Sequence, residues 1–541
     1  MPVAVSYPGV YVEEVSSGVR TVTGVATSIT AFIGRAYCGP VDVPVTINSF
    51  ADFERNFGKL HPDYPLGYAV RDFYQNGGAQ AVVVRLYKPT VDPAPASPPN
   101  TKPAKAIIRI ALLDLEAASQ GAWGNNLRAR IDAAVSADVA ARLGLTAADL
   151  FNVTVRDMAT GTTERIVNLT VKESARRADR VLVTESALVR VAKAVALPGT
   201  AVPSPHPAPA AGKSIWEDDA ASSKVVAADL AVDSAPLDAT AYLGDAAAKT
   251  GMNALQKADL FNLLCIPPDT RNGDTPITVW QGALAFCVPR RAMVIIDAPV
   301  AWSSAGFITA NNIQALTALG LSGDAARNAA LYFPRVIESD PNRQGQLDTF
   351  VPCGCVAGVM ARTDGQRGVW KAPAGIDAAL SGTQGLAVSL TNDENGMLNP
   401  LGVNCLRTFP ISGSVVWGSR TLRGADLLAD EYKYVPVRRL ALYLEGSLFR
   451  GTQWVVFEPN DEPLWSQIRL NVGAFMQNLF RQGAFQGKTP SEAYFVKCDK
   501  ETTTQNDINL GVVNVVVGFA PLKPAEFVII KIQQMAGQIA A

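Results

Sequence analysis

Short apolar runs and helical stripes of apolar residues alternate along the chain, a pattern that predicts an α/β fold. In the first globular stretch, apolar runs at 28–34 and 81–86 predict strands. Large apolar residues at helical spacing predict helices over 49–57 and 66–74, the first with a serine at its N-cap. The order strand, helix, helix, strand indicates helices layered on a sheet.

The same pattern resumes beyond residue 250. Strands are predicted over 260–266, 292–296 and 331–337, with a helix over 277–287 between the first two. This is the spacing of strand–helix–strand units, and it predicts a partly parallel sheet.

The C-terminal third predicts two long helices. One covers 437–448, and the other covers 461–481 with a continuous apolar stripe from Leu464 to Leu479 and Pro463 in its first turn. β-Branched and aromatic runs predict four further strands, over 454–457, 494–497, 510–519 and 527–532.

Two other segments stand apart from this pattern. Prolines cluster between 89 and 103 and again between 198 and 209, so we interpret 90–250 as an insertion that decorates a core and carries strands near 151–156 and 166–171. At the N-terminus, a short strand over 10–15 lies between turn-forming residues. A lone strand cannot satisfy its own backbone, so it must join a sheet of this chain or of a neighbour.

Composition narrows the possible functions of these 541 residues. The chain has 48 Lys and Arg residues and 49 Asp and Glu residues, which gives a net charge of −1. This near-neutral charge argues against nucleic-acid binding and suits a protein that packs against copies of itself. No signal peptide or membrane span is recognisable, so we expect no membrane insertion. The seven scattered cysteines are typical of reduced, buried thiols in a cytosolic-type protein.

Catalytic and ligand-binding motifs are weak throughout. Gly487-Lys488-Thr489 lacks the earlier glycine of a phosphate loop, because residue 482 is Gln. Cys353 and Cys355 are too close for a metal ribbon, and we interpret them as buried thiols on a strand. We therefore expect no cofactor, no metal and no enzymatic activity. One alternative stays open, a cytosolic α/β enzyme with a site near Asp297 or in a polar loop over 362–371.

Several ordered motifs resemble contractile tail sheath proteins of phages and phage-tail-like injection systems. They cover about 7–88, 121–127 and 253–534 and comprise Tyr7-Pro8-Gly9-Val10-Tyr11-Val12-Glu13-Glu14, Gly121-Ala122-Trp123-Gly124-Asn125, Gly358-Val359-Met360-Ala361-Arg362-Thr363-Asp364, Arg367-Gly368-Val369-Trp370, Ala372-Pro373-Ala374-Gly375 and Gly451-Thr452-Gln453-Trp454.

The resemblance implies a mixed α/β, multi-domain fold with an outward insertion and terminal strand arms. The expected division is an N-terminal arm at 1–20, core parts at 21–89 and 251–400, the insertion at 90–250, a tube-facing C-terminal domain at 401–508 and a C-terminal arm at 509–541. The arms would pair with neighbouring subunits through Val10, Tyr11, Val12, Glu13, Val15, Val513, Val515, Val517, Phe519, Phe527 and Ile529.

The resemblance also implies a function. Such a subunit polymerises helically around an inner tube and contracts to drive the tube through a target cell envelope. Expected partners are further copies of the chain, the inner tube protein, and baseplate and terminator or cap proteins, without direct nucleic-acid contact. Assembly would take place in the bacterial cytoplasm, within a phage tail or an injection particle. Residues expected to contact the tube are Arg438, Arg439, Glu445, Arg469 and Arg481. A baseplate or shell protein remains an alternative.

Overall fold

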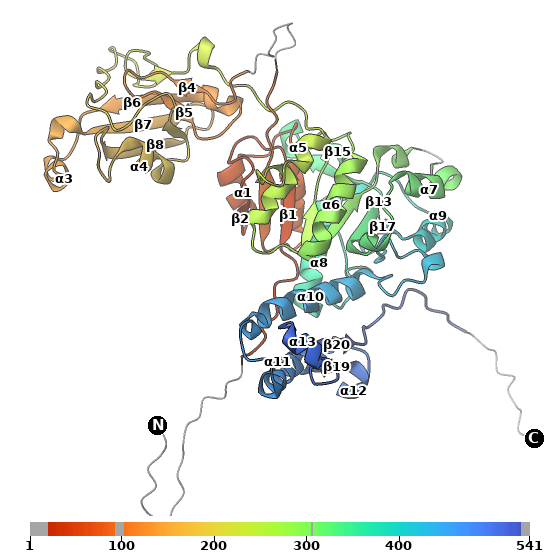
Figure 1. Cartoon of the computed structure of the whole chain (residues 1–541). Helices are drawn as coiled ribbons and strands as arrows, with labels where there is room; N and C mark the ends of the chain where they lie inside the picture. The colour runs from red at the N-terminus through yellow and green to blue at the C-terminus, as the bar shows by residue number, and fades with distance from the viewer. Residues whose placement is uncertain (1–19, 92–101, 305–306, 532–541) are drawn as a thin grey trace, which may run out of the picture.

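The computed structural model describes residues 20–91, 102–304 and 307–531, with the backbone alone for 307–312. Figure 1 shows three bodies: a central α/β layer, a projecting unit and a C-terminal unit below the centre. The strand expected over 10–15 lies outside the described residues.

The central body is built on an eight-stranded sheet in the order β18-β17-β13-β12-β11-β1-β3-β2. Its inner strands run parallel, and only β2 and β18 are antiparallel to their neighbours. The strands are β1 Thr30–Gly34, β2 Val45–Ile47, β3 Ala81–Arg85, β11 Leu263–Cys265, β12 Met293–Asp297, β13 Ala329–Phe333, β17 Val403–Phe409 and β18 Gly413–Val416. The predicted partly parallel sheet is confirmed.

Helices cover both faces of this sheet, which explains why its inner strands are mainly apolar. On one face lie α1 Phe50–Phe57, α2 Pro65–Gln75 and α8 Cys353–Arg367. On the other lie α5 Ala239–Leu243, α6 Ile277–Arg290, α7 Phe307–Ala318 and α9 Asn392–Leu398. The predicted N-cap of α1 is confirmed, because the Ser49 side chain accepts a hydrogen bond from the Asp52 N–H.

Two sequence predictions in this body are wrong. The single strand expected over 331–337 is divided at Pro334 into β13 and β14 Val336–Asp340, and β14 belongs to a separate sheet with β15 Gln346–Phe350 and β16 Thr383–Leu386. Cys353 and Cys355 lie at the start of α8 rather than on a strand, although both are buried and free as expected.

The projecting unit contains two small sheets around its own apolar core, which draws its buried residues from Ala106 to Ala231. The sheets are β4-β5-β9 and β10-β6-β7-β8. Their strands, with two helices, are β4 Ile107–Ile108, β5 Leu115–Ala117, β6 Leu127–Asp132, β7 Phe151–Asp157, β8 Thr163–Leu169, β9 Val189–Val191, β10 Ser223–Lys224, α3 Ala137–Arg142 and α4 Ala178–Glu185.

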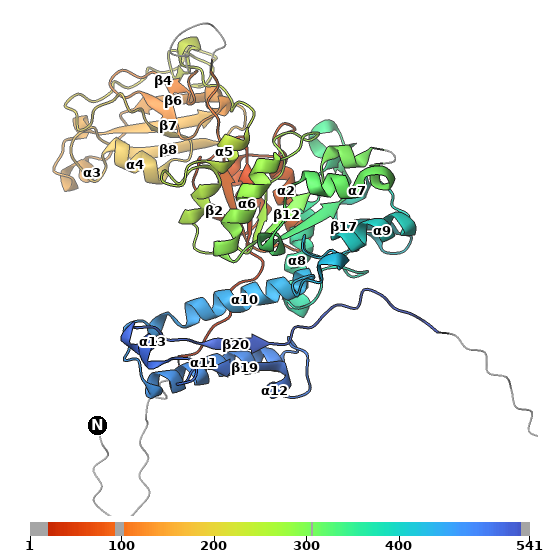
Figure 2. The ribbon, with the colours of Figure 1, turned by 45° about the vertical axis from the view of Figure 1, so that its right-hand side comes forward.

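The C-terminal unit has a fourth core between helices and a small hairpin. Its elements are α10 Val435–Gly451, α11 Glu462–Arg481, α12 Pro490–Ala493, β19 Tyr494–Lys497, α13 Gln505–Asn509 and β20 Val516–Phe519. Helix α10 lies between this unit and the central body (Figure 2), and its buried residues join the cores of both. The strand predicted over 454–457 is wrong, since Gln453–Val455 forms a 3-10 turn.

No helix in the described part of the chain combines the length and apolar character that crossing a bilayer requires.

Candidate assembly interface

The C-terminal unit ends in a two-stranded antiparallel sheet with two open edges. Strands β19 and β20 pair only with each other among the described residues, in a register that joins Tyr494 to Phe519 and Lys497 to Val516. The outer edge of each strand therefore has no strand beside it within the described chain. An open edge presents backbone N–H and C=O groups to any extended segment that reaches it.

The sequence forms this hairpin because one of its faces completes an apolar core. Tyr494, Val496, Val517 and Phe519 pack against the buried stripe of α11, which is capped by Asp461 accepting a hydrogen bond from the Leu464 N–H. The stripe consists of Leu464, Trp465, Ile468, Val472, Phe475, Met476 and Leu479. The hairpin is thus held rigidly on a long helix while its edges stay accessible.

The opposite face of the hairpin carries two exposed apolar side chains beside Gly518 and the exposed Lys497. Phe495 is 50% exposed and Val516 is 45% exposed. Two strands alone make a marginal sheet, and further strands with an apolar covering would complete it. The hairpin therefore has the features of an acceptor for added strands.

An extended arm follows the hairpin. Phe527, Val528, Ile529 and Ile530 are between 73% and 82% exposed, and no ladder pairs them within the described chain. The strand predicted over 527–532 is therefore absent as far as residue 531, and that predicted over 510–519 shortens to β20. Such a run of exposed apolar residues with strand propensity is suited to pairing with another chain.

A buried arginine anchors the base of this arm. The guanidinium of Arg420, fully buried, donates from Nε to Glu526 Oε1 at 2.8 Å and from Nη2 to Oε2 at 2.6 Å. Tyr434 donates to the same carboxylate at 3.2 Å. Sequence reasoning missed this anchor, whose signal was a single acidic residue directly before an apolar run. The contact fixes the point at which the arm leaves the molecule.

The two ends of the described chain leave the C-terminal unit on opposite sides, as Figures 1 and 2 both show. The N-terminal segment runs along α10, where the Val25 N–H donates to Ser447 Oγ at 3.1 Å and Val22 is buried in the C-terminal core. At its outer end Arg20 lies over the Trp454 ring, 4.9 Å from the centroid. The first described residue, Arg20, therefore lies beside this unit.

The residues expected in the arms occupy different places. Val10, Tyr11, Val12, Glu13 and Val15 lie outside the described residues. Val513 and Val515 precede β20, Val517 and Phe519 lie within it, and Phe527 and Ile529 lie in the exposed arm.

The residues expected to contact a tube are divided between the surface and the interior. Arg481 is exposed at the end of α11, and Arg469, near the start of the same helix, pairs with Glu462 at 2.6 Å. Arg438 pairs with Glu445 at 3.2 Å on α10. Arg439, by contrast, has a side chain only 3% exposed and binds Asp364 on α8. Because Arg439 is buried and pairs with Asp364, its side chain does not lie on a surface that a tube could contact.

The polar loop expected over 362–371 is mostly helical, because α8 continues to Arg367. Arg362 donates to the carbonyl oxygens of Asn76 and Ala379, and Asp364 accepts hydrogen bonds from Arg439 and Thr27. These side chains join α8 to its neighbours, so the helix does not present them as an active-site loop.

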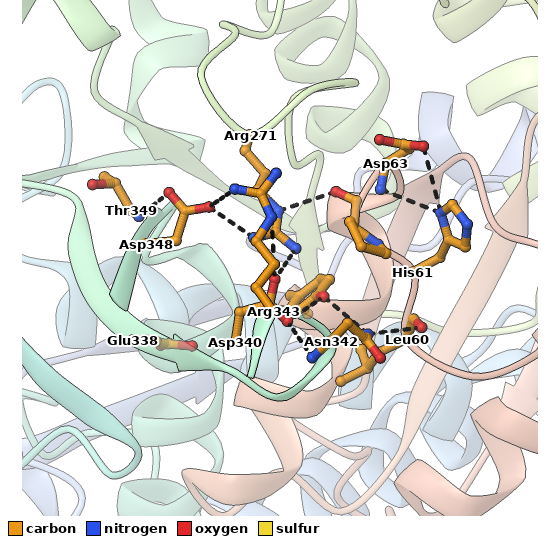
Figure 3. Close-up of polar contacts among 12 residues, drawn as sticks. Leu60, His61, Asp63, Arg271, Glu338, Asp340, Asn342, Arg343, Asp348 and Thr349 are labelled. Carbon is orange, nitrogen blue, oxygen red and sulfur yellow. Dashed lines mark hydrogen bonds and ion pairs between the residues drawn. The ribbon is translucent and has the colours of Figure 1, made fainter. Parts of the chain in front are cut away.

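A buried polar cluster lies where α2, the loop after β11 and the β14–β15 hairpin meet (Figure 3). Arg271, with a side chain 5% exposed, pairs with Asp340 at 2.6 Å and Asp348 at 2.8 Å. Its guanidinium lies over the rings of Tyr68 and Phe350, at 4.6 and 4.9 Å from their centroids. The cation is fully engaged by internal partners, so the cluster holds three segments together.

Nearby, Asp72, Glu338 and Cys355 place three potential metal ligands close together in the described chain. Arg71 already pairs with both carboxylates, at 2.8 Å from Asp72 and in a shorter contact with Glu338. The Arg71 guanidinium therefore lies where a metal ion would otherwise bind these two carboxylates. Burial, followed by the charge of Asp72, raises the pKa of Glu338 to about 9, so that carboxyl group holds a proton at neutral pH.

Part of the chain is similar to proteins of a known family. Residues 429–535, which include α10, α11, the hairpin and the arm, match the family described as phage tail sheath C-terminal domain. The tail sheath protein of Vibrio phage KVP40 is 30% identical over 148 residues, 26% of this chain and 22% of that protein. The tail sheath protein of Enterobacteria phage T4 is 25% identical over 241 residues, 42% of this chain and 33% of that protein.

The matched region thus spans a third or less of the length of these curated relatives. Among solved structures, the PVC sheath complex of an extracellular contractile injection system, in its contracted state, is similar across both chains. The TM-score is 0.56 with 21% identity, and the match covers 98% of each chain, which shows a shared fold. Residues 429–535 thus match the phage tail sheath C-terminal domain, and the chain as a whole shares its fold with the PVC sheath complex.

Proposed function

We propose that this chain is the structural subunit of a contractile sheath. It polymerises helically around an inner tube and contracts to drive the tube through a target cell envelope. The observation that carries the proposal is the C-terminal hairpin, which has two open edges and is followed by an exposed apolar arm. The family match over the same residues supports it.

Strand addition is the proposed link between subunits. The arm beyond Glu526 pairs with an open hairpin edge of one neighbour, and the segment before residue 20 pairs with an edge of another. Because the two ends leave the C-terminal unit on opposite sides, the contact is head-to-tail. A head-to-tail contact that does not close generates a helix of subunits rather than a ring.

Such links are compatible with contraction. Main-chain pairing through extended arms holds subunits together while their rigid bodies rotate. The energy then resides in a metastable arrangement of interfaces that is released in one concerted step.

We further propose how the subunit is oriented. The outward face of α11, which carries Gln467, Leu470, Ala474, Asn478 and Arg481, contacts the inner tube. The projecting unit within 90–250 faces away from the tube. Baseplate and terminator proteins bind the ends of the polymer, and assembly takes place in the bacterial cytoplasm.

The test uses paired substitutions in the arm. Replacing Val528 and Ile530 with proline removes two backbone donors, whereas replacing both with threonine keeps the donors and the strand propensity. Both residues are exposed, so we expect both variants to fold, with circular dichroism spectra like the unmodified protein. In electron micrographs the threonine variant should form tubes and the proline variant should not.

Tubes formed by the proline variant would contradict the arm model. Closed shells or flat discs formed by the unmodified chain would favour the alternative of a baseplate or shell protein.

A further inference from the structure

The projecting unit carries a proline-rich strap, residues 203–209, that lies against the edge of strand β6. Prolines stand at 203, 205, 207 and 209, and a proline cannot donate a backbone hydrogen bond. His206 is the central residue of the strap, and its N–H donates to the Ile131 carbonyl of β6 at 3.0 Å. Strand β10 pairs with β6 at Arg128 and Ala129, so His206 continues the pairing where β10 has ended.

The imidazole of His206 completes this pairing and fixes its own protonation state. Its Nδ1 accepts the Ile131 N–H at 3.0 Å, so this nitrogen carries no proton. The neutral ring therefore has its proton on Nε2, which donates to Ser223 Oγ of β10 at 3.0 Å. His206 thus satisfies both backbone groups of Ile131, as a residue of an antiparallel strand would.

A second set of contacts to the strap comes from Arg130 of β6. Its Nη1 donates to the Pro207 carbonyl at 2.8 Å and to the Ala221 carbonyl at 2.6 Å, and its Nη2 donates to the His206 carbonyl at 3.3 Å. An arginine keeps its charge at any ordinary pH, so these bonds do not respond to acid. The imidazole of His206, by contrast, gains a proton in mild acid.

The surroundings of His206 disfavour a second proton on its ring. Burial, followed by the charge of Arg130, lowers the pKa of His206 below its ordinary 6.5. The acidic groups on neighbouring segments are engaged elsewhere. Asp132 of β6 accepts from an amide side chain, Asp218 accepts from two backbone N–H groups, and Asp219 pairs with a lysine and an arginine.

We propose that His206 is an acid-sensitive latch that holds the strap on the edge of β6. Protonation of Nδ1 directs a donor at the Ile131 N–H, so an accepted hydrogen bond becomes a contact between two donors. The strap then detaches, and the backbone groups of Ile131 are left open on the strand edge. The stabilising contribution of the neutral ring is fully present above pH 6.5 and is lost as the pH falls through the lowered pKa. The inference does not depend on the proposed sheath function.

Hydrogen–deuterium exchange of the full chain, followed by mass spectrometry at pH 7.5 and at pH 4, tests the latch. The matched variant is His206→Asn, because the side-chain oxygen of asparagine takes the position of Nδ1 and accepts the Ile131 N–H at either pH. At pH 7.5, peptides containing Ile131 should be protected in both proteins. At pH 4 these peptides should exchange at least about tenfold faster in the unmodified protein than in the variant, whereas peptides from β12 should exchange equally.

The control is His61→Asn, which removes the other of the two histidines in the sequence. This variant should keep the acid response of the unmodified protein, so it remains informative even if His206→Asn does not hold the strap at pH 7.5. Protection of the Ile131 peptides at pH 4 in the unmodified protein and in His61→Asn would overturn the inference. Equal loss of protection at pH 4 in the unmodified protein and in a His206→Asn variant that is protected at pH 7.5 would also overturn it.

Discussion

Arg439 and Asp364 illustrate how single buried charges connect distant parts of this chain. Both side chains are nearly inaccessible, and the guanidinium donates to both carboxylate oxygens, at 2.9 and 2.5 Å. Thr27 donates to the same carboxylate at 2.6 Å. The pair therefore joins α8, α10 and the N-terminal segment at one point. The sequence places Arg439 beside Arg438 on one helix, and helical spacing alone does not show which of the two is buried.

Asp364→Asn should be strongly destabilising, because it leaves a buried guanidinium without its counter-charge. We expect a loss of about 3–5 kcal/mol in the free energy of unfolding. The matched control is Asp259→Asn, which breaks an exposed pair with Arg450 and should change stability by about 1 kcal/mol or less. Urea titration followed by fluorescence measures the change in the free energy of unfolding for each variant. Equal effects in the two variants would contradict the structural role assigned to Asp364.

The raised pKa of Glu338 predicts that the stability of the folded protein depends on pH. Its pKa is raised by burial from an ordinary 4.5 to about 9, so the folded protein keeps a proton that the unfolded chain releases. This contribution to stability is fully present below about pH 4.5 and is lost as the pH rises through about 9. Glu338→Gln removes the titration, so its stability should fall less between pH 5 and 9 than that of the unmodified protein. Urea titrations at several pH values measure this difference, and parallel pH profiles would rule the assignment out.

Among the elements, α8 is where sequence reasoning failed most clearly. Its first residues were predicted as a strand and its last as a loop, whereas α8 runs without a break from Cys353 to Arg367 although Gly354, Gly358 and Gly365 lower helix propensity. Packing explains the first two glycines: a Cβ on Gly354 would lie 2.0 Å from the Ala69 carbonyl oxygen, and one on Gly358 would lie 2.5 Å from that of Phe73. The two glycines allow α8 to approach the backbone of α2, a requirement that only the folded structure reveals.

Alanine substitutions at two glycines of this helix should have opposite effects. Gly354→Ala forces α8 away from α2, and we expect destabilisation of about 1–3 kcal/mol, as for overpacked cores. Gly365→Ala meets nothing within 4 Å, so the gain in helix propensity should stabilise by up to about 1 kcal/mol. Thermal unfolding measures both shifts. A neutral Gly354→Ala variant would show that the helices are not in close contact.

Other elements were predictable where local pattern and packing agree. The stripe from Leu464 to Leu479 identified α11, and the buried apolar runs identified β1, β3 and β12. The strand predicted from Trp454 to Phe457 was wrong because residues with high strand propensity can also form the turn that follows a helix. The pair Arg420–Glu526 escaped prediction because it joins residues far apart in sequence.

At the scale of the whole molecule, the central α/β body, the projecting unit and the C-terminal unit each have an apolar core, and α10 links the central body to the C-terminal unit. The exposed arm, by contrast, contributes nothing to a core of its own chain in the described region. An apolar segment of this kind is a liability in an isolated monomer and an advantage in a polymer. The arrangement is therefore best explained by assembly with further copies.

Removing the C-terminal arm beyond Glu526 tests whether the arm is needed for assembly. A chain ending at Glu526 keeps the anchor to Arg420 and loses only exposed residues among those described, so it should fold with unchanged thermal stability. It should remain monomeric in analytical ultracentrifugation under conditions where the full chain polymerises. Polymers formed by the shortened chain would show that the arm is dispensable.

The most direct test of the account is a cryo-electron microscopy reconstruction of the polymer formed by the full-length chain. We predict open helical tubes in which extended segments from neighbouring subunits run along the outer edges of β19 and β20. Tubes in which both edges remain unpaired, or monodisperse globular particles under all conditions, would contradict it.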